Sequence, residues 1–168
     1  MNIKTLGILL IILVTTLTGI RISGEYSMRE KRIDCLLLMT DRIVSLIKYG
    51  SFHTREILKR VASDKNFQMI EFPKQAVKFI DSGKDFAQAW DMSVRNDSTL
   101  GCEEREILLQ MGSSLGKSGK KSQISMLEIH TENLRSIRER IVPELRNKRK
   151  LYSSLGVLTG IFVSVMLI

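Results

Sequence analysis

The sequence predicts an all-α protein, an antiparallel helical bundle flanked by two transmembrane helices. Apolar residues recur at intervals of three and four through most of the chain, and no segment shows the alternating pattern of a strand. An uncharged run also lies near each end of the 168 residues. We therefore expect an N-terminal anchor over residues 1–22, a helical bundle over residues 23–150 and a C-terminal anchor over residues 151–168.

The C-terminal run holds eighteen residues without a charged side chain. As a helix it would span roughly 27 Å, close to the ~30 Å hydrocarbon core of a bilayer. Backbone polar groups have no water partner in lipid, so a spanning segment must be helical. Four basic residues precede it and are expected to set its topology: Arg146, Lys148, Arg149 and Lys150.

The N-terminal run, residues 5–20, lies between Lys4 and Arg21 and is slightly short for a span. Both flanking cations can extend toward the membrane surface, which closes the gap. The alternative is a cleaved signal peptide, since Lys4 precedes an apolar stretch. The segment Thr16-Leu17-Thr18 lacks the alanines typical of a cleavage site. The sequence therefore favours an uncleaved anchor.

The net charge of +8 is unevenly distributed. Residues 117–150 carry ten basic and four acidic side chains, whereas residues 21–116 carry fifteen and fourteen. Basic residues that adjoin a membrane segment set its orientation and contact anionic lipid, which we favour over nucleic-acid binding. Since only Lys4 lies outside the first anchor, the bundle is expected in the cytoplasm, with both termini across the membrane.

Within the bundle, an apolar stripe predicts a first helix over residues 29–49, with Gly50 as its C-terminal cap. A second helix is expected over residues 54–62. Pro73 suits the first turn of a third helix, which stops at Gly83.

Asp85 is expected to cap a fourth helix, on which Trp90 is a core residue. A fifth helix, residues 102–115, begins with glutamates that suit the positive end of the helix dipole. A Gly- and Ser-rich break follows. The last helix is expected to begin near Lys120 and to run on toward the membrane, with a kink at Pro143 between bundle and anchor.

No motif predicts catalysis, a metal or a cofactor. Residues 112–118 resemble a phosphate-binding loop, but only three residues separate the glycines and a helix precedes them, which favours a flexible link. His53 and His130 have no partner ligands in the sequence, and His130 falls on an apolar stripe. Cys35 and Cys102 match no metal or redox spacing and are expected to be reduced thiols, unless the bundle is extracytoplasmic.

Two sets of residues are candidates for contacts. Gly156 and Gly160 share one face of the C-terminal anchor, where missing side chains let helices approach closely; alternatively, glycines are simply frequent in membrane helices. Lys117, Lys120 and Lys121 surround the Gly- and Ser-rich break. They form a candidate surface for an acidic partner, or serve only to keep the break solvated.

Several features recur in a familiar order along nearly the whole chain. They are Thr15-Thr16 with Gly19, Tyr49-Gly50, Ala89-Trp90, Leu115-Gly116 followed by Gln123, and Leu155-Gly156 followed by Gly160. In this order and spacing the chain resembles the stage III sporulation protein AB family of endospore-forming bacteria. It departs from that family at Leu46 and Gly119, where an acid is usual, and at Pro143, so no role for those acids is carried over.

The resemblance implies a bundle similar to the cytoplasmic domain of the platform proteins of type II secretion and type IV pilus systems. It also implies a place in the mother-cell apparatus that links mother cell and forespore, in the outer forespore membrane. The expected function is a non-enzymatic scaffold that docks a secretion-type ATPase and contacts other channel components and lipid, although analogy of fold alone does not establish it. The alternative is a membrane-anchored adaptor or regulatory bundle unrelated to transport.

Overall fold

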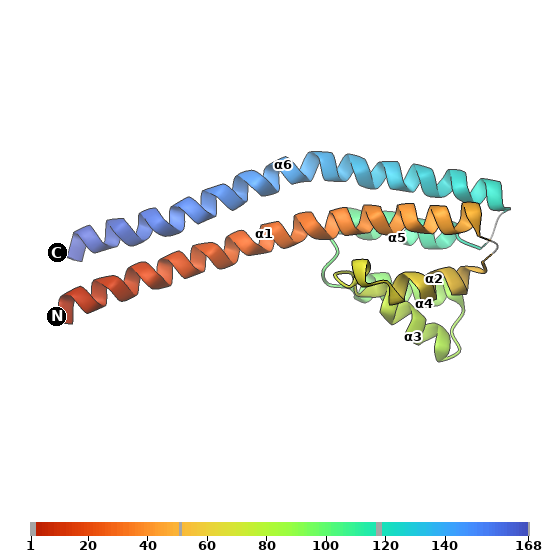
Figure 1. Cartoon of the computed structure of the whole chain (residues 1–168), viewed down its shortest axis with the longest axis horizontal. Helices are drawn as coiled ribbons and strands as arrows, with labels where there is room; N and C mark the ends of the chain where they lie inside the picture. Colours follow the sequence, from red (N-terminus) through yellow and green to blue (C-terminus); the bar gives the residue numbers. More distant parts are fainter. Residues whose placement is uncertain (1–2, 51, 117–118, 168) are drawn as a thin grey trace. The chain divides into compact units, whose positions relative to one another are not determined.

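The computed structural model describes residues 3–50, 52–116 and 119–167, without the side chains of residues 3–12, 157, 160, 161 and 164–167. The described residues form six α-helices and one short 3-10 helix, with no strand among them (Figure 1). The predicted all-α class is therefore confirmed. The contacts divide the chain into two compact units. We call residues 1–31 with 140–168 the two-helix unit, and residues 32–139 the core unit.

Both terminal helices continue past the expected boundary between anchor and bundle. Helix α1 (Ile3–Tyr49) joins the expected anchor and the first bundle helix without a break. The only helix breaker in the junction is Gly24, and one interior glycine costs only about 1 kcal/mol. Helix α6 (Lys120–Leu167) begins where it was expected and continues through Pro143. A proline removes one backbone hydrogen bond, while the residues on both sides remain good helix formers.

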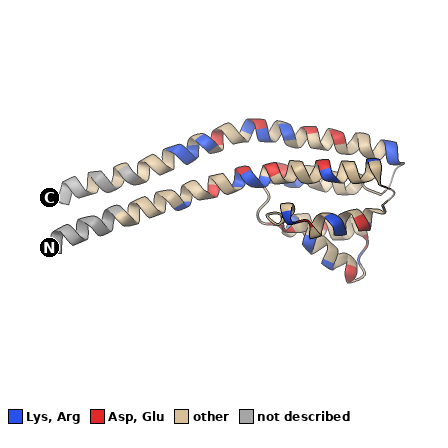
Figure 2. Cartoon of the chain, viewed as in Figure 1, with Lys and Arg blue, Asp and Glu red and all other residues tan. Residues whose placement is uncertain are grey.

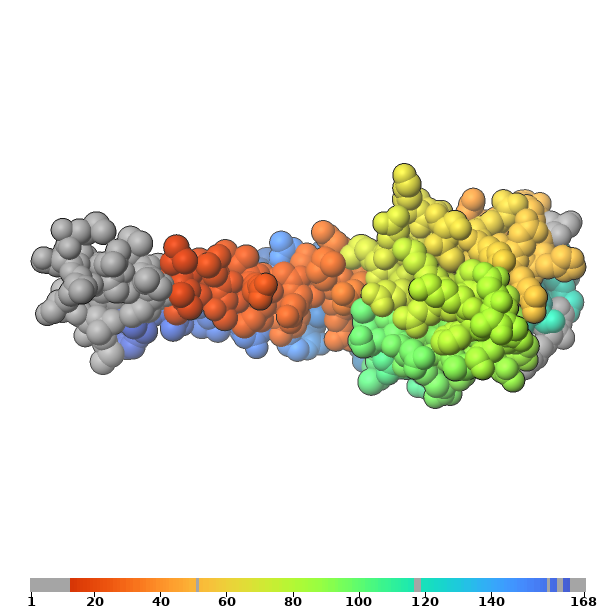
Figure 3. All heavy atoms as spheres, turned by 90° about the horizontal axis from the view of Figure 1, so that it is seen from below, coloured from red at the N-terminus to blue at the C-terminus, as the bar shows by residue number. Residues whose placement is uncertain are grey.

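The short helices follow the predictions closely. They are α2 (Thr54–Ser63), α3 (Phe72–Asp81), α4 (Phe86–Asn96) and α5 (Cys102–Ser114). Pro73 lies in the first turn of α3, and Asp85 caps α4 by accepting a hydrogen bond of 2.7 Å from the Gln88 N–H. Gly83 has a φ of 95°, a conformation that side chains disfavour. Figure 3 shows that α2, α3 and α4 share one face of the core unit.

Local hydrogen bonds explain where α1 ends and why a short 3-10 helix forms in the core unit. The Gly50 N–H donates to the Leu46 carbonyl over 3.0 Å, so Gly50 closes α1 as expected. The 3-10 helix η1 (Lys65–Phe67) was not predicted. The Asp64 carboxylate accepts from the Asn66 N–H at 2.9 Å and starts this single turn. An aspartate two residues before its backbone donor is a common turn signal.

The predicted transmembrane helices find no support in the structure. Among the residues that the structure describes, no helix contains a stretch that is both long enough and apolar enough to cross a membrane.

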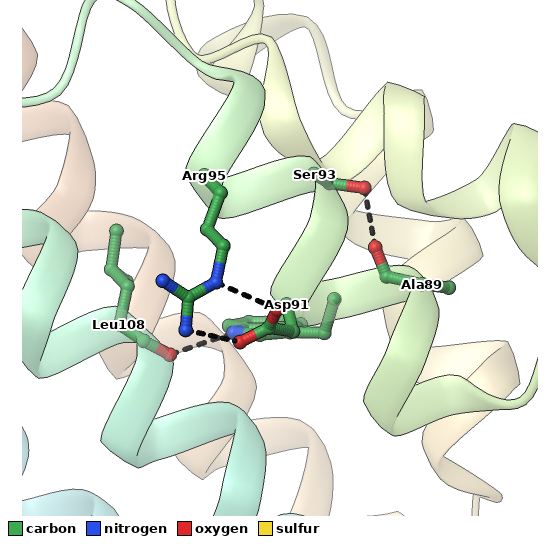
Figure 4. Close-up of polar contacts among 6 residues, drawn as sticks. Ala89, Asp91, Ser93, Arg95 and Leu108 are labelled. Atoms are coloured by element: carbon green, nitrogen blue, oxygen red, sulfur yellow. Dashed lines mark hydrogen bonds and ion pairs between the residues drawn. The ribbon is translucent and has the colours of Figure 1, made fainter.

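Trp90 is the centre of the core unit. Its side chain is only 2% exposed, and its indole N–H donates a hydrogen bond of 2.7 Å to the Leu108 carbonyl of α5. Phe72 of α3 meets the indole edge-on, with ring centroids 5.1 Å apart. Figure 4 shows the Leu108 carbonyl directed toward α4, where the Asp91–Arg95 ion pair occupies the exposed side. The expectation that Trp90 is a core residue is confirmed.

Asp97, just after α4, is a buried carboxylate that the sequence analysis did not single out. It is 1% exposed, and its Oδ2 accepts from the backbone N–H groups of Glu71 and Phe72 at 3.3 and 3.1 Å. Its Oδ1 accepts from the Thr99 N–H and hydroxyl at 2.9 and 2.6 Å. Asp97 therefore fixes the start of α3 against the loop after α4. Negative charge at a helix N-terminus is favourable, which adds to this role.

Three further groups from the sequence analysis lie in the core unit. Cys35 and Cys102 are both free thiols; Cys35 is buried, which raises the pKa of its thiol by desolvation, and Cys102 is exposed. His130 is largely buried on the apolar stripe of α6, and desolvation lowers the pKa of its imidazole. It therefore belongs to the core, although its Nδ1 has no hydrogen-bond partner among the described residues.

The packing of Trp90 makes a prediction about Gly112. A Cβ atom at Gly112 would collide with Cδ1 of the indole. Because the tryptophan is enclosed on other sides, Gly112→Ala should lower the free energy of unfolding by about 1–3 kcal/mol. Denaturant unfolding followed by the fluorescence of Trp90, the single tryptophan, measures this.

The control is Gly119→Ala, where a Cβ atom would meet nothing within 4 Å. This variant should leave the midpoint nearly unchanged. Equal midpoints for the two variants would refute tight packing at Gly112.

Candidate functional site

The two-helix unit pairs the first part of α1 with the last part of α6. The two segments run antiparallel, side by side (Figure 1). A Cβ atom at Gly19 would lie 3.0 Å from the Gly156 Cα atom, and one at Gly156 would lie 3.1 Å from the Gly19 Cα atom. The backbones thus approach more closely here than side chains would permit. Gly156, a predicted packing residue, lies at this crossing, whereas the surroundings of Gly160 lie outside the described side chains.

Two further contacts join the same two helices at positions nearer the middle of the chain. Tyr26 and Tyr152 stack with ring centroids 5.6 Å apart and an interplanar angle of 12°. Beyond them, Nε and Nη2 of Arg146 donate to Oε1 of Glu30 at 2.9 and 2.7 Å. The three contacts fit one antiparallel register, because a later position on α1 meets an earlier one on α6.

A polar notch of about 760 Å³ opens between these helices. We call it the basic notch. On α6 its residues recur at intervals of three and four, so they share one face of the helix. The lining comes from two residues of α1 and five of α6: Ser23, Glu30, Arg146, Arg149, Lys150, Ser153 and Ser154.

The predicted topology-setting residues have different surroundings. Arg146 is bound to Glu30, and Nζ of Lys148 lies 2.6 Å from Oε1 of Glu144. The hydrogen bond between these two side chains lowers the pKa of Glu144 and raises the pKa of Lys148. Arg149 and Lys150 form no salt bridge with a described residue. Figure 2 shows a basic cluster in the second half of α6.

The predicted partner surface is only partly described. Lys120 and Lys121 are exposed in the first turn of α6, and Lys117 lies outside the described residues. The break before α6 begins at Gly116. Its φ of 82° favours glycine, which has no Cβ atom to clash with the backbone. The two lysines are therefore accessible to a partner.

No metal site can be assembled from the described side chains. None of their His, Cys, Asp and Glu residues form a group of three that could hold a metal ion.

Sequence reasoning missed the contribution of α1 to the basic notch. Ser23 lies between the expected anchor and the first expected helix, and Glu30 lies in the first turn of that helix. Their spacing of seven residues places them on one helical face, and this was the available signal. Their partners on α6 could not be known without the register of the two helices.

The described chain is thus a helical protein built from two long helices and four short ones, with a polar notch where the long helices pair. A protein of this class matches the model of the stage III sporulation protein AB family over residues 4–168, so the chain belongs to that family. It is similar to stage III sporulation protein AB of Bacillus subtilis (strain 168), with 28% identity over 171 residues that cover 98% of each chain. The resemblance inferred from the sequence is confirmed. No solved structure matches the chain.

The close crossing predicts the effect of adding a methyl group. In Gly19→Ala, the new Cβ atom would lie 2.9 Å from the Tyr152 carbonyl oxygen and 3.0 Å from the Gly156 Cα atom. The helices must move apart, so local opening of α1 should become easier by about 1–3 kcal/mol. Hydrogen exchange of the α1 amides, read by mass spectrometry, measures this.

Gly24→Ala is the matched control, because a Cβ atom there would meet nothing within 4 Å. Both variants gain the same helix propensity, so their difference isolates the contact between the helices. If the two variants exchanged equally, the crossing would not contribute to the stability of the pair.

Proposed function

We propose that this protein is a membrane-anchored, non-enzymatic scaffold of a sporulation apparatus, on which a secretion-type ATPase docks. Membership of the stage III sporulation protein AB family carries the proposal, because it places the chain among sporulation proteins. The docking and channel roles come from the resemblance to platform proteins. In this proposal residues 1–22 and 151–168 anchor the chain in the outer forespore membrane, and residues 23–150 lie in the cytoplasm.

The surface of the two-helix unit supports attachment to a membrane. Large apolar side chains of this unit are more than 40% exposed on both helices. Contiguous exposed apolar surface is unfavourable in water and is typical of contact with lipid or with another protein. The exposed residues are Leu13, Val14, Leu17, Ile20 and Met28 of α1, and Leu151, Leu155, Leu158 and Phe162 of α6.

The two cysteines provide a test of the membrane attachment. Cys102 is exposed and should react with a membrane-impermeant maleimide, whereas Cys35 is buried and should react slowly. In protoplasts of sporulating cells, we expect labelling of Cys102 only after lysis, and recovery of the chain with the membranes after alkaline washing.

A Cys102→Ser variant controls for labelling at Cys35. Labelling of Cys102 in intact protoplasts would place the core unit outside the cytoplasm. Recovery of the whole chain in the alkaline supernatant would refute the anchors.

The exposed lysines at the start of α6 are the proposed docking surface for an acidic region of the ATPase. A Lys120→Glu/Lys121→Glu variant should weaken capture of the ATPase by at least about tenfold, because facing like charges cost several kcal/mol. Co-purification of the two full-length proteins from detergent-solubilised membranes measures this.

A Lys74→Glu/Lys78→Glu variant is the control, since it reverses the same number of charges on exposed residues of α3. Equal capture by both variants would remove Lys120 and Lys121 from the docking surface. No capture of the ATPase by the unmodified protein would favour the alternative, a membrane-anchored adaptor unrelated to transport.

A further inference from the structure

We propose that the basic notch binds the phosphodiester group of an anionic phospholipid, with Arg149 and Lys150 as the residues that hold the phosphate. The proposal rests on the proposed attachment to a membrane, and it assigns a ligand to a site that family membership does not explain.

Two contacts hold the helices that line the notch together. At one end the helix backbones meet at Gly19 and Gly156, where a Cβ atom would already be too close. At the other end the Glu30–Arg146 ion pair joins the same two helices at 2.7 Å. The notch itself has a volume of about 760 Å³, which exceeds the needs of a phosphate and accommodates a lipid headgroup.

The charges in the notch suit one phosphodiester. Three basic side chains and one carboxylate line it, and the carboxylate of Glu30 already binds Arg146. Arg149 and Lys150 form no salt bridge with a described residue, so both charges are available to a ligand. A guanidinium group can bind two phosphate oxygens at once, and an ammonium group adds a point charge.

Hydroxyl groups supply the remaining donors. Ser153 and Ser154 follow the two cations by one helical turn on α6, and Ser23 faces the notch from α1. Each hydroxyl can donate one hydrogen bond to a phosphate or glycerol oxygen and accept others. The notch therefore offers both charge and orientation to a polar headgroup.

The neighbouring surface favours a lipid as the source of the phosphate. Leu151 directly follows Lys150, and the side chains of Leu151, Leu155 and Leu158 are 56, 45 and 61% exposed. Their spacing places them on one face of α6, beside the face that lines the notch. An acyl chain can cover this apolar face while the headgroup occupies the notch. Basic pockets between membrane helices on the cytoplasmic side bind anionic headgroups in the same way.

The test uses the purified full-length chain in an uncharged maltoside detergent and isothermal titration calorimetry. The probes are short-chain phosphatidylglycerol, short-chain phosphatidylcholine and inorganic phosphate. We expect binding of phosphatidylglycerol in preference to the other two. An Arg149→Gln/Lys150→Gln variant should bind it roughly 30-fold more weakly, since each basic residue near anionic lipid contributes about a factor of five.

Lys74→Gln/Lys78→Gln is the matched control, because it removes two charges from exposed residues of α3. It should bind phosphatidylglycerol like the unmodified chain. Equal binding of phosphatidylglycerol and phosphatidylcholine, or equal losses in the two variants, would overturn the proposal. Binding of inorganic phosphate with the same dependence on Arg149 and Lys150 would replace the lipid with a soluble phosphate.

The failure of the membrane attachment is separable from the failure of this site. A chain recovered in the alkaline supernatant would refute the anchors, whereas the titration with dispersed short-chain lipid does not require a bilayer. A chain that pellets with the membranes but shows no preference for phosphatidylglycerol would refute the lipid site alone.

Discussion

The core unit depends on the enclosure of one indole ring. Trp90 contacts Phe72 of α3 and Phe86 of its own helix, and its N–H satisfies the Leu108 carbonyl of α5. A buried tryptophan combines a large apolar surface with a polar group that must find a partner. The ring therefore fixes both the distance between three helices and their rotation. The missing side chain at Gly112 makes room for it.

The two-helix unit is held by a different balance of forces. Close backbone approach at Gly19 and Gly156 replaces the interlocking of large side chains, and the Glu30–Arg146 ion pair fixes the register. Because Arg146 is well exposed, this pair adds little stability in water and serves chiefly to orient the helices.

Local signals in the sequence predicted the short helices well. Pro73, Asp85 and Gly83 act through their immediate neighbours, and such effects can be recognised without the tertiary structure. The continuity of α1 was missed because the change from an uncharged run to an amphipathic stripe suggested a boundary where the backbone has none. Asp97 and Glu30 were missed because their partners lie 25 and 116 positions away. Lys120 and Lys121 at the start of α6 were recognisable as a charged pair, whereas the proposed partner belongs to another molecule.

The sequence distance between Glu30 and Arg146 has a consequence for the order of folding. Their separation of 116 positions makes direct ring closure of an unfolded chain entropically costly. The Asp34–Arg138 ion pair belongs to the core unit and brings the two flanks together once that unit has folded. Pairing of the terminal helices then becomes a short-range step. During synthesis, the N-terminal half of the pair must therefore wait for nearly the entire polypeptide before it meets its counterpart.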